Sequence, residues 1–224
     1  TENAKNRFSE KLILSEYLPM YFYKPEPTNR LLDSQLTLKN KYFCSQNLIK
    51  VHPHFDEIIN KILIEDKKAE ILFIKDKNEI ISKKLFERFK KHIPSYERIN
   101  FLSKVSLEKY INLCGSSSVL LDTLYFGAGN SFHESMLYGT PTVTMPTANL
   151  KSRIVLGAYK QMKINNPPIV SSVDDYVQKA VEIANLSEKK MLDIKKYYSK
   201  NARDFLFENN EAVKDLEKIF LNLR

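Results

Sequence analysis

The sequence lacks any long apolar run. No apolar stretch approaches the roughly 18 to 20 residues that a helix needs to cross a bilayer, and the longest ones are short enough to be buried strands. We therefore expect no membrane span. The chain also begins with neither a signal peptide nor an initiator methionine, since its first residue is Thr1. This start suggests a piece of a longer protein.

Cysteine is scarce as well, with only Cys44 and Cys114, both inside apolar segments. These two residues could form one disulfide. Two buried thiols in a reducing compartment fit the pattern better, because disulfides are rare inside cells. We therefore expect a cytoplasmic protein.

The positive charge comes without a nucleic-acid-binding motif. Lys and Arg number 35 against 27 Asp and Glu, which gives a net charge of +8. Such a balance favours anionic partners in general. However, many lysines alternate with glutamates over 78–92 and 187–219, which is typical of solvated helix faces. No basic-aromatic stripe accompanies the charge, so we do not expect nucleic acid as a partner.

From residue 41 onward, short apolar segments alternate with amphipathic ones. Strands alternating with helices predict right-handed βαβ crossovers, and thus an α/β fold with a Rossmann-like, doubly wound parallel sheet. After about residue 173 the pattern is helical throughout, with a cap at Ser187 and a break at Asn209. The expected strands are 41–45, 70–75, 99–102, 119–122, 142–145 and 168–171, and the expected helices between them are 53–64, 78–92, 106–114, about 131–138 and 149–160.

The first 40 residues have a different pattern. Residues 7–18 resemble a helix, which Pro19 would end, and residues 20–23 are expected to be extended. Residues 24–40, with several prolines and mixed polar residues, predict a linker. The sequence therefore divides into three parts: 1–40, an α/β lobe over 41–186, and C-terminal helices over 187–224.

Glycine is rare, and three of the five glycines (Gly127, Gly129 and Gly139) lie close together. The loop 127–131 should follow a parallel strand and lead into a helix, whose free amides and dipole suit a diphosphate. In this region Asn130 and Ser131 could cap the helix and donate to a ligand, and Glu134 could accept both hydroxyls of a ribose. An ordinary capped helix, with glycines that only permit tight packing, would explain the same residues.

Several other sites are excluded by the sequence. The loop has Phe132 where the dinucleotide fingerprint has its third glycine, and no Gly-x-x-x-x-Gly-Lys-Ser/Thr loop occurs. Redox and ATPase functions are therefore not expected. No Asp-x-Asp motif occurs, and His52 and His54 have no third ligand nearby, so we expect no metal site.

The most specific motif is Gly139-Thr-Pro-Thr-Val-Thr-Met-Pro146, at a fixed spacing after Leu121-Asp122-Thr123. Leu150-Lys-Ser152-Arg153 follows it, and Phe43-Cys-Ser-Gln-Asn47-Leu-Ile-Lys50-Val-His-Pro53 precedes it. Together these motifs resemble the C-terminal catalytic lobe of the O-linked N-acetylglucosamine transferase family, which is family 41-like, includes SPINDLY-like proteins and has the GT-B architecture. The resemblance covers nearly the whole chain up to about residue 186.

The resemblance implies a division of labour among the three parts. Residues 41–186 would be the lobe that binds a UDP-sugar, 187–224 would be helices that return to the first lobe, and 1–40 would be the tail of an N-terminal lobe plus a linker. The acceptor would be a hydroxyl, Ser or Thr of a protein, and the remaining lobe and upstream helical repeats would be further partners. No cofactor is implied, because a GT-B site can replace a metal with a helix dipole and a lysine.

The resemblance also implies roles for individual residues. Lys50 would be the catalytic residue that reaches the donor diphosphate and stabilises the leaving nucleotide. The implied nucleotide-binding residues are Asn47, the loop amides of Gly129, Asn130 and Ser131, Glu134 at the ribose, Tyr110 where the family usually has a His near the donor, and Val105 beside the uracil-binding position.

Departures from the family pattern keep alternatives open. The family's His-Thr-Thr is Gly129-Asn130-Ser131 here, and Glu134 stands where the family has Asp. His133, next to the site, is more typical of a structural histidine. Another GT-B enzyme, acting on a glycan or lipid or as a sugar-nucleotide epimerase, and a non-catalytic nucleotide- or protein-binding lobe both remain possible. We expect the fragment alone to transfer no sugar.

Overall fold

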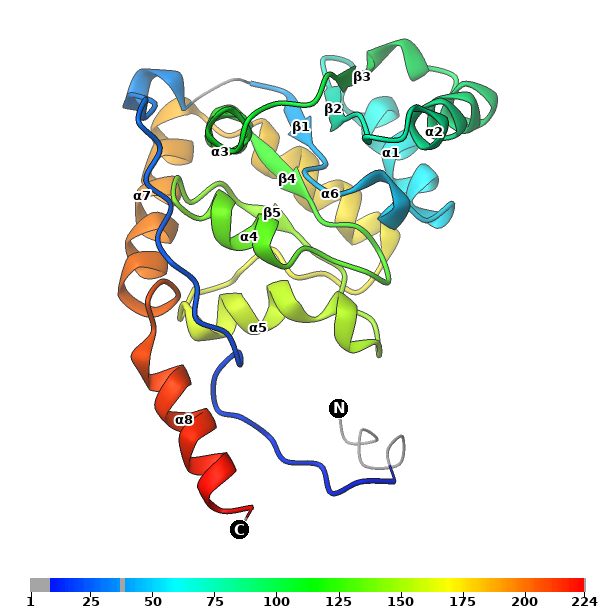
Figure 1. The fold of residues 1–224 in the computed structure, drawn as a ribbon. Coiled ribbons are helices and arrows are strands. Elements are labelled where there is room, and N and C mark those ends of the chain that lie inside the picture. Colours follow the sequence, from blue (N-terminus) through cyan, green and yellow to red (C-terminus); the bar gives the residue numbers. More distant parts are fainter. Residues whose placement is uncertain (1–8, 37–38, 224) are drawn as a thin grey trace.

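A computed structural model describes residues 9–36 and 39–223. Its centre is a five-stranded sheet in the order β3-β2-β1-β4-β5 (Figure 1), in which every pair of neighbouring strands is parallel. The doubly wound, Rossmann-like α/β fold expected from the sequence is therefore confirmed. The strands are β1 (Lys41–Phe43), β2 (Glu70–Ile74), β3 (Ile99–Leu102), β4 (Val119–Leu121) and β5 (Thr142–Val143).

The helices follow the polar and apolar periodicity of the sequence, and side chains of Asn or Ser cap several of them. Asn78 accepts a backbone N–H at the start of α2, and Ser106 does so at the start of α3. The α-helices are α1 (His54–Glu65), α2 (Glu79–His92), α3 (Leu107–Ser116), α4 (Asn130–Ser135), α5 (Ile154–Gln161), α6 (Val173–Ala184), α7 (Glu188–Phe205) and α8 (Asn210–Leu221), and the 3₁₀ turns are η2 (Asp33–Gln35), η3 (Leu48–Lys50), η4 (Tyr96–Arg98) and η5 (Leu150–Ser152).

Side chains of each strand alternate between two covered faces of the sheet. Tyr42 and Phe73 belong to the core formed with α1, α2 and α6, whereas Phe43 and Leu120 pack with Cys114 of α3. Helices α4, α5 and α7 form a further apolar cluster. Cys44 and Cys114 are both buried free thiols, and burial raises the pKa of each thiol far above its ordinary value. In the described part of the chain, no helix combines the length and apolar character needed to cross a bilayer.

Helix α7 is joined to the sheet by a buried lysine. The ammonium of Lys195 donates to the carbonyl oxygens of Leu36 at 2.8 Å, Gly115 at 2.7 Å and Ser117 at 2.7 Å. Burial lowers the pKa of Lys195 to about 7, yet three carbonyl acceptors require the three N–H donors of the charged form. Close by, Gly139 has a φ of +67°, and a Cβ there would lie 2.1 Å from the carbonyl oxygen of Lys195.

The N-terminal segment differs from the sequence expectation. Residues 7 and 8 lie outside the described residues, but 9–18 contain no helix, so the predicted helix over 7–18 is wrong there. The main chain bonds to distant elements instead: the N–H of Leu18 donates to Gln161 of α5, and the carbonyl of Phe22 accepts from Glu208. These tertiary bonds replace the local ones that a helix needs. Figure 1 shows the segment running beside α7.

Two expected elements are shorter than the sequence suggests. The predicted strand 168–171 consists of a single bridge between Thr144 and Ile169, because β5 is already short and the ladder ends there. The predicted helix 149–160 is divided into η5 and α5, with Arg153 between them outside helical geometry. The strand and helix boundaries elsewhere agree with the expected segments within a few residues.

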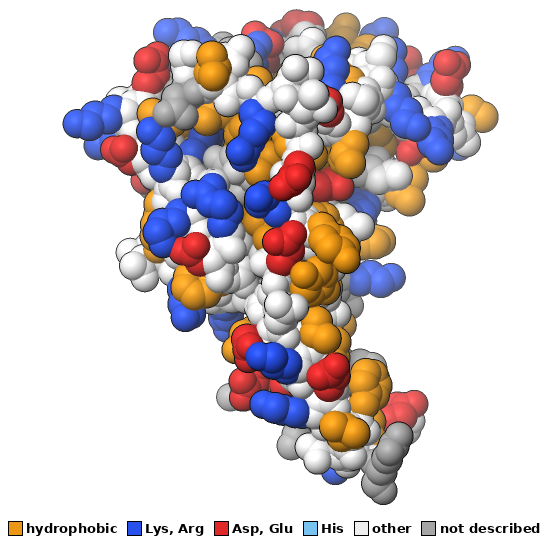
Figure 2. Space-filling view, turned by 60° about the vertical axis from the view of Figure 1, so that its left-hand side comes forward, with side chains coloured by type: hydrophobic (Ala, Val, Ile, Leu, Met, Phe, Trp, Pro, Cys, Tyr) orange, Lys and Arg blue, Asp and Glu red, His pale blue; other side chains and the backbone are white. Residues whose placement is uncertain are grey.

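Helix α8 extends away from the sheet and keeps most of its apolar side chains in contact with solvent. Only Ala212 is buried among its residues, whereas Phe220 is 66% exposed and Leu221 is 65% exposed. Figure 2 shows hydrophobic side chains gathered along this projecting end of the molecule. The N-terminal segment reaches the same helix, since the hydroxyl of Ser15 donates to Asp215 at 2.5 Å.

Candidate functional site

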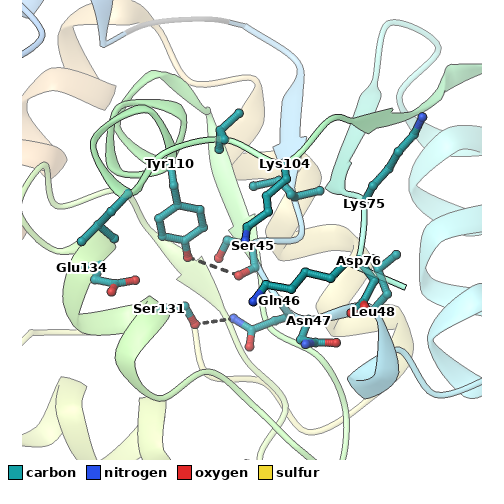
Figure 3. A pocket seen from close by; sticks show the side chains of 14 residues that line it. Ser45, Gln46, Asn47, Leu48, Lys75, Asp76, Lys104, Tyr110, Ser131 and Glu134 are labelled. Carbon is teal, nitrogen blue, oxygen red and sulfur yellow. Dashed lines mark hydrogen bonds between the residues drawn. The ribbon is translucent and has the colours of Figure 1, made fainter. Parts of the chain in front are cut away.

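The strand order reverses between β1 and β4, and a cavity opens at the carboxyl ends of the strands beside this point. Ligands of open α/β sheets bind at such a reversal, because the loops leave the two strands in opposite directions. The cavity has a volume of about 600 Å³. Its lining, much of which is drawn in Figure 3, consists of Ser45, Gln46, Asn47, Leu48, Ile74, Lys75, Asp76, Lys77, Lys104, Val105, Leu107, Tyr110, Ser131 and Glu134.

The structure brings most of the sequence-predicted residues to this cavity. Asn47 follows β1, Val105 and Tyr110 lie after β3, and Ser131 and Glu134 belong to α4 after β4. In Figure 3, Tyr110, Ser131 and Glu134 lie on one side of the cavity, and Lys75 and Asp76 lie on the other. The remaining predicted residues do not line it; they are Lys50, Gly129 and Asn130.

Gln46 connects the two sides of the site, and the sequence did not single it out. Its side chain is 6% exposed, its Nε2 donates to the Oγ of Ser131 at 2.7 Å, and its Oε1 accepts from the ammonium of Lys50 at 3.1 Å. The only signal in the sequence is its position beside Asn47 in the loop after β1. The amide thereby fixes the position of a hydroxyl and an ammonium at once.

Lys50 lies beside the cavity at the end of η3. Its ammonium donates to the carbonyl of Gly127 at 3.1 Å and lies 4.3 Å from the centre of the Phe126 ring. Partial burial lowers the pKa of Lys50, and the nearby Asp122 carboxylate opposes that shift. The arrangement holds a cation within the loop that follows β4.

Asp122 holds the loop that follows β4 in place through hydrogen bonds. Its carboxylate is buried and accepts the N–H of Ala128 at 2.7 Å and the hydroxyl of Thr144 at 2.7 Å. Burial raises the pKa of Asp122 to about 6, although these two hydrogen bonds favour the charged form. A Cβ at Gly127 would lie 2.8 Å from this carboxylate, so the close turn of the loop requires a glycine.

The start of α4 differs in detail from the sequence expectation. Neither Asn130 nor Ser131 caps the helix: Gly129 occupies the cap position, and no side chain accepts a hydrogen bond there. Both residues are already inside the first turn, and the hydroxyl of Ser131 is engaged by Gln46. The first amides of α4 have no carbonyl of an earlier helical turn to donate to.

Glu134 and Tyr110 contribute polar atoms to the same side of the cavity. Burial raises the pKa of the Glu134 carboxyl above its ordinary value. Tyr110 donates its hydroxyl to the carbonyl oxygen of Ser45 at 3.2 Å, and burial raises its pKa so far that the phenol remains neutral. The hydrogen bond orients the ring at the edge of the cavity.

The histidines near the site contact aromatic rings. His133 is buried, stacks on Phe22 with ring centres 4.8 Å apart, and has its Nδ1 3.1 Å from the carbonyl oxygen of Gly129; burial lowers its pKa. His54 has its Nδ1 2.8 Å from the hydroxyl of Tyr125, and His52 packs against the same ring. Within residues 9–36 and 39–223, no group of three or more His, Cys, Asp or Glu side chains is arranged to hold a metal ion.

Comparison with known proteins places the chain in a class of folds. No family model matches the sequence, and no curated protein matches it. Solved structures do match: the Rossmann-like α/β fold is shared with glycosyltransferases of the GT-B architecture.

Three of these structures illustrate the likeness. A mutant of the O-GlcNAc transferase of Thermobaculum terrenum has a TM-score of 0.71 at 17% identity over 81% of this chain. A mutant of TarM of S. aureus, in complex with Fondaparinux, alpha-GlcNAc-glycerol and UDP, has a TM-score of 0.60 at 10% identity over 96% of this chain. A UDP-forming α,α-trehalose-phosphate synthase from Burkholderia xenovorans has a TM-score of 0.56 at 10% identity over 85% of this chain. The chain spans 35%, 41% and 45% of those chains, respectively.

Proposed function

We propose that this chain is the donor-binding part of a GT-B glycosyltransferase and that its cavity binds a UDP-sugar. The observation that carries the proposal is the network at the strand reversal, in which Gln46 holds both Ser131 and Lys50. A hydroxyl, an ammonium and the first amides of α4 together suit a diphosphate. The similar structures support the choice, because TarM was solved in complex with UDP and the trehalose-phosphate synthase is UDP-forming.

In the proposed reaction an acceptor hydroxyl attacks the anomeric carbon of the sugar, N-acetylglucosamine or another hexose. The new bond forms to the acceptor oxygen, which gives up its proton to water, the bond to the diphosphate oxygen breaks, and UDP leaves with the bonding electron pair. Lys50 and the amides of Gly129, Asn130 and Ser131 would stabilise the charge that develops on the leaving oxygen. Ser or Thr of a protein is the proposed acceptor, by resemblance to the O-linked N-acetylglucosamine transferases.

The proposal assigns the donor side alone to this chain. The acceptor side would come from another lobe, so the chain by itself is expected to bind UDP but to transfer no sugar. The proposed compartment is the cytoplasm, which agrees with two buried free thiols. Neither a metal nor another cofactor is proposed.

Calorimetric titration of the chain with UDP, and with ADP and GDP for comparison, tests the donor site. We expect selective UDP binding that Lys50→Ala weakens by roughly tenfold or more, because a hydrogen bond to a charged group contributes about 1.5–3 kcal/mol. The matched control is Lys151→Ala, since Lys151 also lies against the Phe126 ring, at 5.2 Å, whereas it is the ammonium of Lys50 that donates to Gln46, a residue of the cavity lining. Equal binding of all three nucleotides, or no binding at millimolar UDP, would contradict the proposal.

One observation favours a second function. The ammonium of Lys50 already has two carbonyl-type acceptors, Gln46 Oε1 and Gly127 O, which is also the arrangement of a structural lysine. In a non-catalytic lobe, Lys50 would only stabilise the fold through these two hydrogen bonds. Measuring Lys50→Ala for both thermal stability and UDP affinity separates the two functions: a large loss of stability with unchanged affinity would favour the non-catalytic lobe.

A further inference from the structure

A second cavity lies at the outer edge of the sheet, between α2 and β3. It has a volume of about 930 Å³. Helix α2 contributes Lys83 and Phe86, strand β3 contributes Phe101, and Ser103 follows the strand. We call this cavity the edge groove; its full lining is Lys75, Asp76, Lys77, Glu79, Ser82, Lys83, Phe86, Ile99, Asn100, Phe101, Ser103 and Lys104.

The edge groove exposes unpaired main chain. Strand β3 is the last strand of the sheet and pairs only with β2 among the described residues. The carbonyl of Leu102 accepts the N–H of Lys75, so Leu102 directs its main chain toward β2. Since residues of a parallel strand alternate in this respect, Phe101 directs its N–H and C=O groups toward the open edge. The N–H of Ser103 points the same way, because it lies opposite the Leu102 carbonyl in one planar peptide group. An edge of this kind is a template for an added strand.

The floor of the edge groove is a fixed aromatic surface. Phe101 stacks on Phe73 with ring centres 5.4 Å apart, and it meets Phe86 edge to face at 6.0 Å. Phe89 packs against Phe101 from the core side. Phe86 is 36% exposed, so a rigid apolar contact is available to a side chain that enters the groove.

The charge of the edge groove is positive. Lys75, Lys77, Lys83 and Lys104 line it, against two carboxylates, and all four lysines are exposed. One of those carboxylates, Asp76, already accepts the N–H of Asn78. Four flexible ammonium groups around an open strand edge complement a segment that carries negative charge.

We propose that the edge groove binds an extended acidic peptide of a partner protein, which pairs its main chain with the open edge of β3. Alternate side chains of the peptide pack on Phe86 and Phe101, and its carboxylates pair with the lysines of the rim. Strand addition of this type takes its affinity from main-chain hydrogen bonds and its specificity from alternate side chains. The edge groove adjoins the cavity beside β1 and β4, and Lys75, Asp76, Lys77 and Lys104 line both. Lys83, Phe86 and Phe101 line the edge groove but not that cavity, so changes at these residues test peptide binding separately from nucleotide binding.

Fluorescence anisotropy of the chain with a labelled hexapeptide of alternating Glu and Val tests the proposal. We expect saturable binding that Lys83→Glu weakens by roughly fivefold or more. The matched control is Lys84→Glu, which makes the same charge change on the same helix but outside the edge groove. A peptide in which every second amide is N-methylated should bind at least about fivefold more weakly, because one of its edges cannot donate.

Two further measurements make the test decisive. Binding should shift the NMR signals of the Phe101 and Ser103 amides, and UDP affinity should be the same in the wild type and in Lys83→Glu. The proposal is overturned if the hexapeptide does not bind at millimolar concentration, or if Lys84→Glu weakens it as much as Lys83→Glu. Unchanged binding of the N-methylated peptide, or tighter binding of a thymidine hexanucleotide than of the peptide, would overturn it as well.

Discussion

The Nε2 of Gln46 lies 2.7 Å from the Oγ of Ser131, and this hydrogen bond joins the loop after β1 to the first turn of α4. The two loops belong to opposite halves of the sheet, because the strand order reverses between β1 and β4. The same amide accepts from Lys50. The side chains of Ser131 and Lys50 are therefore held by one amide before any ligand arrives.

Replacing Ser131 with Ala should weaken both the fold and the site. The change leaves the buried Nε2 of Gln46 without its acceptor, which costs about 1 kcal/mol and lowers Tm by roughly 2–4 °C. UDP affinity should fall by roughly fivefold, since one hydroxyl and the fixed position of Gln46 are lost. Thermal unfolding and calorimetry measure the two effects.

The control for this prediction is Ser103→Ala. Ser103 is exposed and lines the edge groove rather than the cavity beside Ser131. A Ser131→Ala protein with the stability and UDP affinity of the Ser103→Ala protein would show that the Gln46–Ser131 bond contributes to neither.

Asp122 should make stability depend on pH. Burial raises its pKa from 3.8 to about 6, so the folded state keeps a proton that the unfolded state has already released. The stabilising contribution of this proton is complete below about pH 4 and is lost as the pH rises through about 6, with a size on the order of 3 kcal/mol. The difference in unfolding free energy between the wild type and Asp122→Asn should fall by up to that amount from pH 4 to pH 7.

The hydroxyl of Thr144 provides a check on the same group. It donates to the Asp122 carboxylate and favours its charged form. In Thr144→Val the pH-dependent loss should therefore move to higher pH, which urea denaturation at a series of pH values would detect. The difference in unfolding free energy between the wild type and Asp122→Asn should change between pH 4 and pH 7. If it does not, the pKa of Asp122 is not raised in the folded state.

Gly139 should tolerate no side chain. Its φ of +67° is unfavourable for other residues, and a Cβ would overlap the carbonyl oxygen of Lys195 and lie 2.5 Å from the amide nitrogen of Ser199. Because both contacts are with backbone, Gly139→Ala should destabilise the protein by about 3 kcal/mol or more. Urea denaturation measures this, and a loss below about 1 kcal/mol would show that α7 can move away from the turn.

The contact between Leu18 and Gly157 should appear as a coupling between two mutations. A Cβ at Gly157 would lie 2.8 Å from the Cδ2 of Leu18, the end of a flexible side chain. In the wild type, Gly157→Ala should therefore cost about 1 kcal/mol through overpacking. In a Leu18→Ala background the same change should stabilise α5 by roughly 0.5–1 kcal/mol, because Ala has the higher helix propensity. Equal effects in the two backgrounds would show that the N-terminal segment does not pack there.

The sheet could be predicted because its strands are short, apolar and separated by amphipathic segments. Residues 70–75 and 99–102 show this pattern clearly and form β2 and β3. Of the helix expected over 7–18, the described residues 9–18 form none, because local periodicity cannot reveal distant partners such as Asp215 and Gln161. The strand expected over 168–171 failed because pairing depends on a neighbour, and β5 is only two residues long.

The sequence predicted the residues of the candidate site that have a local signal, but not those that depend on distant contacts. Ser131 and Glu134 stand out in a glycine-rich loop and the helix that follows it, so the sequence pointed to them directly. Gln46 did not stand out, since nothing near it in the sequence shows that it meets Ser131, 85 positions away. That contact exists only because the strand order brings β1 next to β4.

The buried ammonium of Lys195 also bears on how the chain folds during synthesis. Its three acceptors, on Leu36, Gly115 and Ser117, precede it by 159, 80 and 78 positions. A nascent chain that ends at residue 186 already contains the five strands of the described sheet, but it lacks the ammonium that binds these carbonyl groups. These three hydrogen bonds can form only after α7 has left the ribosome, so a helix made late completes the contacts of a sheet made earlier.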